Sequence, residues 1–333
     1  MITIKDISRE CGVSPATVSK ALNGYSDIGA ATAERIRRVA RELHYMPNSA
    51  ARQLKTNISR NIGVVFEDDT QSGLTHEYFS RVLNSAKNEV EQLGYDITFI
   101  SPKFGGSFTE HCRDRTCDGV LIACVDFTKP AITELINSEF PVITIDYSFE
   151  GRSCVMSDNA EGAYQLTRYL IGNGHRKIAF IHGEDTSVTR RRISGFYRAC
   201  QESRITVPDE YLQQGRYHDT QASAEATERL MTLENRPTAI LYPDDYAWLG
   251  GRSQLEHMGL SVPEDVSVAG YDGIPLAQVL QPKLTTWYQD ADAIGRVSGR
   301  KLVETIENRH GSIAGEHQIP GKLMPGESVR KLD

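Results

Sequence analysis

Acidic and polar residues follow several short apolar runs, at the points where β-strands are expected to end. These residues are Glu67-Asp68, Asp126, Asp146-Tyr147, His182-Gly183, Asp244-Asp245 and Asp272. Ligands of open parallel sheets bind beyond the carboxyl ends of the strands. Because carboxylates accept hydrogen bonds from hydroxyl groups, this ring of acids predicts a site for a polyhydroxylated small molecule such as a sugar. As an alternative, Asp245, and Asp244 with it, could cap the helix that follows.

No residue pattern indicates catalysis or a cofactor. GxGxxG does not follow the first expected strand, no GxxxxGK[ST] segment occurs, and no Gly-x-Ser-x-Gly elbow is present. The six cysteines form no CxxC pair, and the spacing of His111, Cys112 and Cys117 matches no common zinc site. We therefore expect reduced thiols, no catalytic residue, no metal and no cofactor, and a protein that is not an enzyme.

The composition is typical of a folded protein with two or three domains. The 333 residues are 39% hydrophobic and 24% charged. Met1–Asp6 has no basic stretch followed by an apolar run, and no apolar run approaches the roughly 18 residues of a membrane span. These patterns indicate neither export nor membrane insertion, so we expect a cytoplasmic protein.

A basic N-terminal part is separated from an acidic remainder. Net charge is −7, yet residues 1–60 contain ten Lys or Arg against five Asp or Glu. The remaining 273 residues contain 27 Lys or Arg against 39 Asp or Glu. A basic module on an acidic body is typical of a phosphate-binding head on a receptor, although a solvated basic helix would show the same asymmetry.

The first residues have the pattern of two short helices joined by a tight turn. Thr3 and Asp6 form a capping box for the first helix, which ends at Gly12. Ser14 can cap a second helix that begins with Pro15, where the missing N–H costs nothing. This pattern predicts a helix-turn-helix, whose second helix is the candidate for reading DNA.

The outer face of the second helix carries small side chains that allow close approach to base edges. It consists of Pro15, Ala16, Thr17, Ser19 and Lys20. Lys20 can donate to guanine O6 or N7, and Thr17 or Ser14 can donate to a phosphate. A third amphipathic helix is expected over residues 30–44. A surface helix without a ligand would show the same face.

The segment after Pro47 predicts a helix that folds only against a partner. Asn48 can cap about seven helical residues, far fewer than the roughly 12–15 that an isolated helix needs in water. The face made by Ala50-Ala51 is small, and Leu54 is expected to protrude. These features suit the minor groove, where an apolar side chain can part a base step.

The rest of the chain alternates apolar runs with amphipathic segments. The expected strands are 62–66, 95–101, 119–124, 142–145, 178–181, 239–242 and 266–269. The expected helices are 78–93, 131–137, 159–171, 191–202, 220–233, 246–257 and 291–308. This alternation predicts parallel sheets covered by helices on both faces. The strands are too many for one sheet, so we expect two lobes that divide near Ser157-Asp158, with a return crossing near 284–286.

The N-terminal motifs resemble those of the lactose-repressor/galactose-repressor (LacI/GalR) family in order and spacing. The matching residues are Ile4-Lys5-Asp6-Ile7, Gly12-Val13-Ser14, Ala16-Thr17-Val18-Ser19, Leu22-Asn23, Leu43, Tyr45, Pro47-Asn48, Ala51-Arg52 and Leu54. In that family the second helix reads the major groove, and a leucine at the position of Leu54 enters the minor groove. The resemblance implies DNA contacts from Ser14, Pro15, Ala16, Thr17, Ser19, Lys20, Asn23, Asn48, Ala51 and Leu54.

The resemblance continues to the C-terminal region. It is carried by Tyr78-Phe79, Asp118-Gly119-Val120, Pro141-Val142, Asp158-Asn159, Gly174-His175-Arg176-Lys177-Ile178, Arg192, Gly195-Phe196, Pro237-Thr238-Ala239, Pro263-Glu264-Asp265-Val266, Gly270-Tyr271-Asp272 and Leu284-Thr285-Thr286. It implies an α/β fold with an N-terminal all-α helix-turn-helix head and a two-lobed, periplasmic-binding-protein-like effector domain with parallel sheets.

The resemblance also implies domain limits. We expect the head at 1–47, a hinge helix and linker at 48–60, and the effector-binding and dimerisation domain at 61–333. The effector domain is expected to divide into lobe 1, about 61–157 and 287–318, and lobe 2, about 158–286 and 319–333.

The positions that meet effectors in relatives can be carried over residue by residue. They are Tyr78, Phe79, Asp146, Arg192, Tyr217, Asp244 and Asp272. Arg192 offers a planar donor fork, Asp272 an acceptor, and Phe79 or Tyr217 a stacking face. As alternatives, Arg192 could lie on a helix surface and the aromatic side chains could belong to the core.

Some residues depart from the family pattern. Gly29 and Ala33 stand where a serine cap and an arginine are usual, and Gly326 replaces an arginine. Asp244 stands where asparagine is usual, and Trp248 replaces a small residue. We expect both of these to reshape the effector pocket, so Trp248 is included among the candidate pocket residues.

The implied function is that of a homodimeric transcriptional regulator on a pseudo-palindromic DNA operator. We expect a repressor of carbohydrate-utilisation genes that a sugar releases from DNA. One alternative is a purine- or nucleoside-responsive regulator of the same fold. Two others are a solute-binding receptor without DNA function and a doubly wound enzyme.

Overall fold

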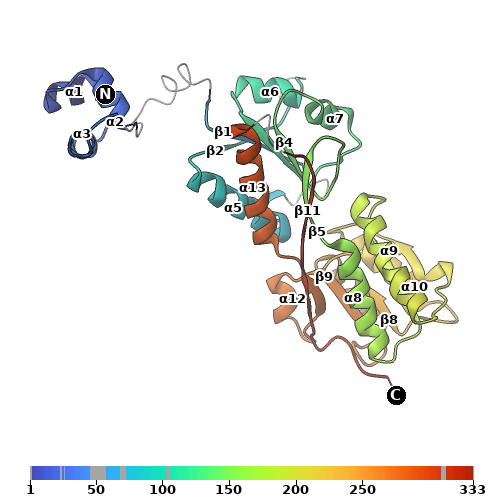
Figure 1. Cartoon of the computed structure of the whole chain (residues 1–333). Helices are drawn as coiled ribbons and strands as arrows, with labels where there is room; N and C mark the ends of the chain where they lie inside the picture. Colours follow the sequence, from blue (N-terminus) through green and yellow to red (C-terminus); the bar gives the residue numbers. More distant parts are fainter. Residues whose placement is uncertain are drawn as a thin grey trace. The chain divides into compact units, whose positions relative to one another are not determined.

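The computed structural model describes residues 2–22, 25, 27–45, 58–67, 73–102, 106–308 and 313–332. The chain divides into two compact units, Met1–Ser59 and Arg60–Asp333 (Figure 1). The expected hinge helix after Pro47 and the candidate DNA contacts Asn23, Asn48, Ala51 and Leu54 lie outside the described residues. Within the described part of the chain, no helix is long and apolar enough to cross a membrane.

In the residues of the N-terminal unit that the structure describes, three helices surround one small core. They are α1 (Ile4–Cys11), α2 (Pro15–Leu22) and α3 (Ala30–Glu42). Ile7, Val18 and Ile36, one from each helix, are completely buried and pack in the same cluster. The predicted helix-turn-helix is therefore present, and α3 ends at Glu42 instead of residue 44.

Local contacts determine where α1 begins and ends. The Asp6 carboxylate accepts hydrogen bonds from the Thr3 N–H at 2.9 Å and the Thr3 hydroxyl at 2.7 Å, which confirms the predicted capping box. Gly12 ends the helix with φ +60°, a left-handed conformation that side chains rarely adopt. Gly29, which precedes α3, provides no side-chain cap.

The second unit is built on two six-stranded sheets. Lobe 1 contains β1 (Asn61–Phe66), β2 (Asp96–Phe99), β3 (Gly119–Ala123), β4 (Val142–Ile145), β5 (Ser153–Ser157) and β11 (Glu316–Ile319). Their order is β11-β5-β4-β3-β1-β2, and all neighbours are parallel.

Lobe 2 repeats this plan with one antiparallel edge. It contains β6 (Ile178–His182), β7 (Leu212–Gln214), β8 (Ala239–Leu241), β9 (Ser267–Asp272), β10 (Thr285–Tyr288) and β12 (Lys322–Met324). Their order is β12-β10-β9-β8-β6-β7, and only the β10–β12 pairing is antiparallel. The chain passes between the lobes after β5, after β10 and after β11, so the return crossing lies beyond the predicted 284–286.

Helices cover the faces of both sheets (Figure 1). In lobe 1 they are α5 (Glu77–Gln92), α6 (Phe108–Asp114), α7 (Pro130–Ile136) and α13 (Ala291–Glu307). In lobe 2 they are α8 (Asn159–Gly172), α9 (Ser187–Glu202), α10 (Thr220–Met231), α11 (Ala247–His257) and α12 (Pro275–Val279).

Strands β5, β7, β10, β11 and β12 were not predicted from the apolar runs. β7 and β12 have three residues each and lie at sheet edges. β11 has the sequence Glu-His-Gln-Ile, with only alternate residues half-buried. Such strands are stabilised by the hydrogen bonds and side chains of their neighbours, so their own composition gives a weak signal.

Glycines bring three pairs of helices into backbone contact. A Cβ atom on Gly295 of α13 would lie 2.2 Å from the Val82 carbonyl oxygen of α5. A Cβ on Gly195 of α9 would lie 2.0 Å from the Ala160 oxygen of α8, and one on Gly250 of α11 would lie 1.7 Å from the Thr220 oxygen. These distances leave no room for a side chain, so the three glycines determine how closely each pair packs.

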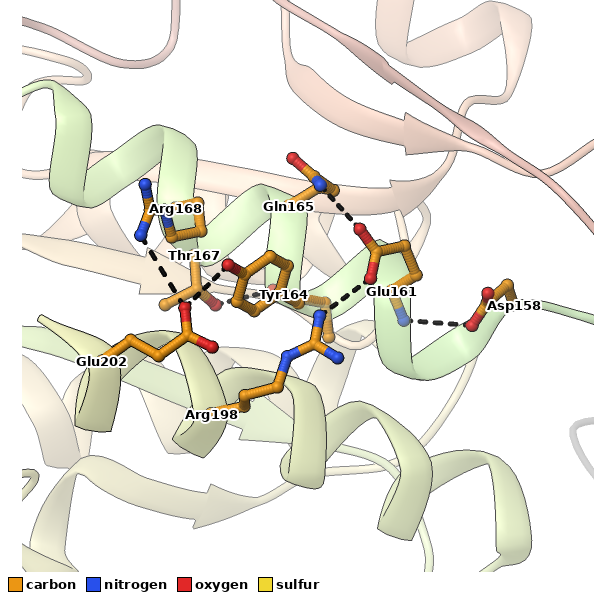
Figure 2. Close-up of polar contacts among 9 residues, drawn as sticks. Asp158, Glu161, Tyr164, Gln165, Thr167, Arg168, Arg198 and Glu202 are labelled. Carbon is orange, nitrogen blue, oxygen red and sulfur yellow. Dashed lines mark hydrogen bonds and ion pairs between the residues drawn. The ribbon is translucent and has the colours of Figure 1, made fainter.

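The outer sides of α8 and α9 carry a polar network (Figure 2). The Arg198 guanidinium lies 3.7 Å from the centre of the Tyr164 ring, and its Nη2 donates to Glu161 at 2.8 Å. The Tyr164 hydroxyl donates to Glu202 at 2.7 Å. Exposed pairs of this kind contribute little to stability individually, so the glycine contact matters more for the spacing of the two helices.

Gly195→Ala is expected to destabilise the protein, because the new methyl group collides with the α8 backbone. Overpacking of this kind costs about 1–3 kcal/mol. Gly172→Ala in α8 is the matched control, since a Cβ there meets nothing within 4 Å. Urea unfolding should show a lower midpoint for the first variant and an equal or higher midpoint for the control. Equal midpoints in both variants would contradict the close-packing argument.

Candidate DNA-reading helix and ligand cavity

The outer face of α2 is available in the N-terminal unit. Pro15, Ala16 and Lys20 are exposed, while Val18 and Ala21 on the opposite face are buried. The Ser14 hydroxyl accepts a hydrogen bond from the Thr17 N–H at 3.1 Å and lies 2.9 Å from the Thr17 hydroxyl. Ser14 therefore caps α2, as its sequence position predicts.

Lys20 does not extend freely from α2. Its ammonium group forms an ion pair with the Asp27 carboxylate, and both side chains remain about half exposed, at 47% and 53%. Ser19 is half-buried on the same helix. The candidate reading face thus combines small side chains with one charged pair.

A cavity of about 460 Å³ lies between lobes 1 and 2, at the carboxyl ends of the strands. This volume is in the range of small-molecule sites. Of the predicted pocket residues, Tyr78, Phe79, Asp146, Arg192, Tyr217, Asp244 and Asp272 line it. Of the remaining strand-end residues, Glu67, Asp126 and Tyr147 line it, whereas His182, Gly183 and Asp245 do not. Asp68 lies outside the described residues.

Trp248 does not belong to the cavity, which corrects the expectation drawn from its position. Its side chain is 1% exposed and meets Tyr242 edge to face, with ring centroids 5.1 Å apart. It packs in the core of lobe 2 between α11 and the sheet. The indole ring of Trp248, at a position where relatives have a small residue, fills volume in the core and does not line the cavity.

Asp244 is the helix cap here, one of the two possibilities that the sequence offered, whereas the expectation that Asp245 caps the next helix is wrong. Asp244 accepts from the Ala247 N–H at 2.7 Å at the start of α11, and from the His218 N–H at 2.7 Å. Asp245 accepts from the Thr286 hydroxyl at 2.6 Å and the Ile274 N–H at 2.9 Å. Asp245 thus connects neighbouring parts of lobe 2, and Asp244 is both a cap and a cavity residue.

Arg192 lines the cavity and is only 4% exposed. Together with Asp146 and Asp272 it is called the cavity floor below. Its Nε donates to Asn159 Oδ1 at 2.8 Å, and Nη1 donates to the Pro243 carbonyl at 2.7 Å. The guanidinium lies 3.5 Å from the centre of the Tyr271 ring. The planar group is therefore held from three sides, which excludes the alternative of a surface arginine.

Two buried polar atoms of the cavity lining have no hydrogen-bond partner among the described residues. Asp272 accepts from the Gln289 amide at 2.6 Å. Asp146 Oδ1 is buried and has no hydrogen-bond partner among the described residues, and the same is true of the Tyr78 hydroxyl. Because buried polar atoms normally have partners, these atoms indicate hydrogen bonds to a ligand or to water.

Burial raises the pKa values of these acids. It raises the pKa of Asp146 to about 6, against the opposing effect of Arg192. The pKa of Asp272 lies well above its ordinary value because of burial and the nearby Asp244. Burial also raises the pKa of Asp245 to about 8. Burial of these acids therefore lowers the stability of the folded protein at pH values where they are ionised.

The cavity is acidic as a whole. Seven carboxylic acids line it against three arginines, Arg190, Arg192 and Arg216. Two of these are already paired, because Arg190 contacts Asp185 at 2.7 Å and Arg216 contacts Glu184 at 3.3 Å. An anionic ligand would find little free positive charge here.

Several contacts join the two lobes around the cavity. The His76 ring from lobe 1 stacks on the His218 ring from lobe 2, with centroids 4.0 Å apart. The Ser187 hydroxyl donates to the Asp146 carbonyl at 2.9 Å, and Arg191 donates to both carboxylate oxygens of Glu316 at 3.0 Å. Of these residues only Asp146 was predicted as a site residue. His76, Ser187, Arg191, His218 and Glu316 were not, because no distinctive motif marks them in the sequence.

Further cavity residues were missed for the same reason. They include Phe127, Glu184, Thr186, Arg190, Arg216 and Gln289. Phe127 lies four residues beyond the end of β3, which a search of strand ends does not reach, and Gln289 directly follows β10, a strand that the apolar runs did not predict. Among the described residues, no group of three or more His, Cys, Asp or Glu side chains is arranged to hold a metal ion.

Comparisons with known proteins agree with this architecture. Residues 3–48 match the family model "Bacterial regulatory proteins, lacI family", and residues 167–329 match the "Periplasmic binding protein-like domain". The chain is 34% identical to the HTH-type transcriptional repressor PurR of Vibrio vulnificus, with 100% of both chains covered. The chain belongs to the LacI family. It is also 33% identical to PurR of Vibrio atlanticus over 93% of each chain.

Solved structures of LacI-family members have the same fold. The lac repressor dimer bound to operator and the anti-inducer ONPF matches with a TM-score of 0.79, 25% identity and 99% coverage of both chains. A LacI family regulator from Enterococcus faecium with bound ribose matches with a TM-score of 0.70 and 25% identity, over 82% of this chain and 100% of the other. The relatives are transcriptional repressors, so the chain is a DNA-binding transcriptional repressor of the LacI family and not an enzyme.

Asp146→Asn is expected to stabilise the ligand-free protein above pH 6. The pKa of Asp146 is raised to about 6, so its stabilising contribution is present below the ordinary value of 3.8 and is lost as pH rises through 6. The variant should therefore melt at a higher temperature than the wild type at pH 7.5, and the difference should shrink towards pH 4.

Asp126→Asn is the control for this measurement. Hydrogen bonds from Thr128 lower the pKa of Asp126, which also lines the cavity, so its contribution has the opposite sign. Its replacement should give an equal or lower melting temperature at pH 7.5. Parallel pH profiles for the two variants would contradict the assignment of Asp146 as a strained acid.

Proposed function

We propose that this repressor binds its operator as a homodimer in the cytoplasm, and that a purine base or nucleoside in the interlobe cavity controls its affinity for DNA. The proposed class of ligand rests mainly on the residues of the cavity floor. There, buried acceptors on Asp146 and Asp272 surround the fixed guanidinium of Arg192. The proposal replaces the sugar expected from the ring of strand-end acids.

The relatives support a purine ligand. The PurR repressor of Vibrio vulnificus, which is purine-responsive, resembles the chain over its full length at 34% identity. Their similarity includes both the N-terminal unit and the ligand-binding unit, since 100% of each chain is covered.

The chemistry of the floor suits a planar heterocycle. A purine has ring N–H donors for the carboxyl oxygens of Asp146 and Asp272, and ring or exocyclic acceptors for Arg192. The rings of Phe79 and Tyr217 also line the cavity and offer faces or edges for stacking. A donor-rich ligand would satisfy the buried Asp146 Oδ1, which has no partner among the described residues.

The charge of the cavity favours an unphosphorylated ligand. Two of its three arginines are engaged with acids at the rim, and Arg192 is surrounded by carboxyl groups and aromatic rings. A phosphate would meet seven acids in the lining. The charge balance therefore supports a base or nucleoside in preference to a nucleotide.

A sugar remains the second candidate because of one specific observation. A LacI family regulator at 25% identity has been solved with bound ribose, in the same two-lobed fold. Carboxylates that accept from sugar hydroxyls would also satisfy Asp146 and Asp272. A nucleoside, which carries a ribose, would use both kinds of contact.

A ligand panel tests the proposal. Hypoxanthine, guanine, inosine, guanosine 5′-monophosphate, ribose and cellobiose are added to the full chain, and binding is measured by calorimetry and thermal shift. We expect a base or nucleoside to bind and raise the melting temperature. The monophosphate should bind at least about tenfold more weakly, equivalent to about 1.4 kcal/mol. Binding of a free sugar alone would refute the purine proposal and support the second candidate.

Replacement of Arg192 tests the link between the cavity and DNA. An operator is first selected from a random duplex library. Arg192→Lys should weaken the ligand more than about tenfold and remove its effect in a gel-shift assay, because lysine lacks the planar fork. DNA binding without ligand should persist.

Two further variants keep that experiment interpretable. Arg198→Lys, on the outer side of the same helix, should leave both properties unchanged. Asp272→Asn provides an independent disruption of the floor if the first variant fails to fold. Normal ligand control of DNA binding in both floor variants would exclude this cavity as the controlling site.

A further inference from the structure

Lys20 and Asp27 form an exposed donor–acceptor pair beside the reading face of α2. The Lys20 ammonium contacts the Asp27 carboxylate, while 47% and 53% of the two side chains remain exposed. The Tyr25 N–H donates to the Lys20 carbonyl at 3.1 Å, which ties the segment between them to the end of α2. The pair is formed in the protein without DNA.

An acid at this position needs an explanation. A carboxylate near the DNA backbone is repelled by phosphates, and an exposed ion pair contributes only about 0–1 kcal/mol to folding. Other acids of the unit serve elsewhere: Asp6 caps α1, and Glu34 and Glu42 pair with arginines on α3. Asp27 is the acid that contacts a candidate base-reading side chain in the described part of this unit.

The major-groove edges of the base pairs offer such a carboxylate specific partners. Cytosine N4 and adenine N6 are the donors there, so an acid must face one of them. An ammonium group has three donors, and Lys20 gives one of these to Asp27. Two donors remain, which equals the two acceptors of guanine, O6 and N7.

A G·C pair presents these groups in the required order. Its major-groove edge runs from two adjacent guanine acceptors to the cytosine N4 donor, whereas an A·T pair alternates acceptor, donor and acceptor. A neighbouring lysine and aspartate therefore match the G·C edge. On the A·T edge, one lysine donor would have no acceptor. We propose that Lys20 and Asp27 act as one unit that reads a single G·C base pair in each operator half-site.

This inference rests on the proposal that α2 is the reading helix, and it adds Asp27 as a specificity-determining residue. Asp27 would accept from cytosine N4 and position Lys20 towards guanine O6 and N7. The loss of a good bidentate contact costs about 1–3 kcal/mol of discrimination, or roughly 5–150-fold. The cost should be confined to one position in each half-site.

Operator selection from a random duplex library tests the inference. The full-length wild type, Lys20→Ala, Asp27→Ala and the double variant are compared, with and without hypoxanthine or inosine. Glu34→Ala is the matched control, since it removes an exposed acid that is paired with an arginine on α3. Because all of these side chains are exposed, circular dichroism should show an unchanged helix content.

We expect the wild type to select G·C at one position per half-site. Lys20→Ala and Asp27→Ala should each reduce the preference over A·T at that same position by about fivefold or more, and the double variant should add little. Affinity for non-specific DNA should be unchanged or higher for Asp27→Ala, because a negative charge has been removed. Glu34→Ala should keep the wild-type preference.

Four outcomes would overturn the inference, and each identifies what has failed. If only Lys20→Ala relaxes a position, lysine reads alone while α2 remains the reading helix. If Asp27→Ala changes affinity equally for every sequence, or if the common position is A·T, the pair does not read G·C. If the wild type selects no duplex under any condition, the proposed role of α2 in reading DNA fails as well.

Discussion

The arrangement of lobe 2 around the cavity depends on the contacts of one buried group, the guanidinium of Arg192. A charge removed from water is costly unless hydrogen bonds and neighbouring charges compensate it. Asn159, the Pro243 carbonyl and the Tyr271 ring provide this compensation from α8, the end of β8 and β9. One side chain of α9 therefore holds several elements of lobe 2 in place. The same arrangement leaves the carboxyl group of Asp272 beside a fixed set of donors.

The floor of the cavity belongs to both lobes, which gives a ligand the means to act on their geometry. Asp146 follows β4 in lobe 1, whereas Arg192 and Asp272 come from lobe 2. A molecule that contacts Asp146 and Arg192 together adds to the direct contacts between the lobes, such as the stacked rings of His76 and His218. Differential contacts in two arrangements of the lobes are the requirement for control of a distant DNA site.

The two units use opposite charge for different partners. The N-terminal residues are basic, as a phosphate-rich partner requires, and the cavity is lined by more acids than arginines. In the acidic cavity, burial raises the pKa values of Asp146 and Asp272, so the empty site is destabilised at neutral pH. Binding of a donor-rich ligand would recover part of this free energy. In the basic unit the Asp27 carboxylate contacts the Lys20 ammonium, and we propose that this contact directs the ammonium towards a base pair.

The sequence by itself determined those features that arise from residues close together along the chain. The capping box of Thr3 and Asp6, the parallel sheets and the acids that follow their strands could be predicted, because each arises from residues close together in the chain. The tertiary structure alone decided that Trp248 fills the core, that Asp245 contacts Thr286 and Ile274 within lobe 2, and that His76 meets His218. These outcomes depend on where segments from two sheets meet in space, and no periodicity or cap within one segment carries that information.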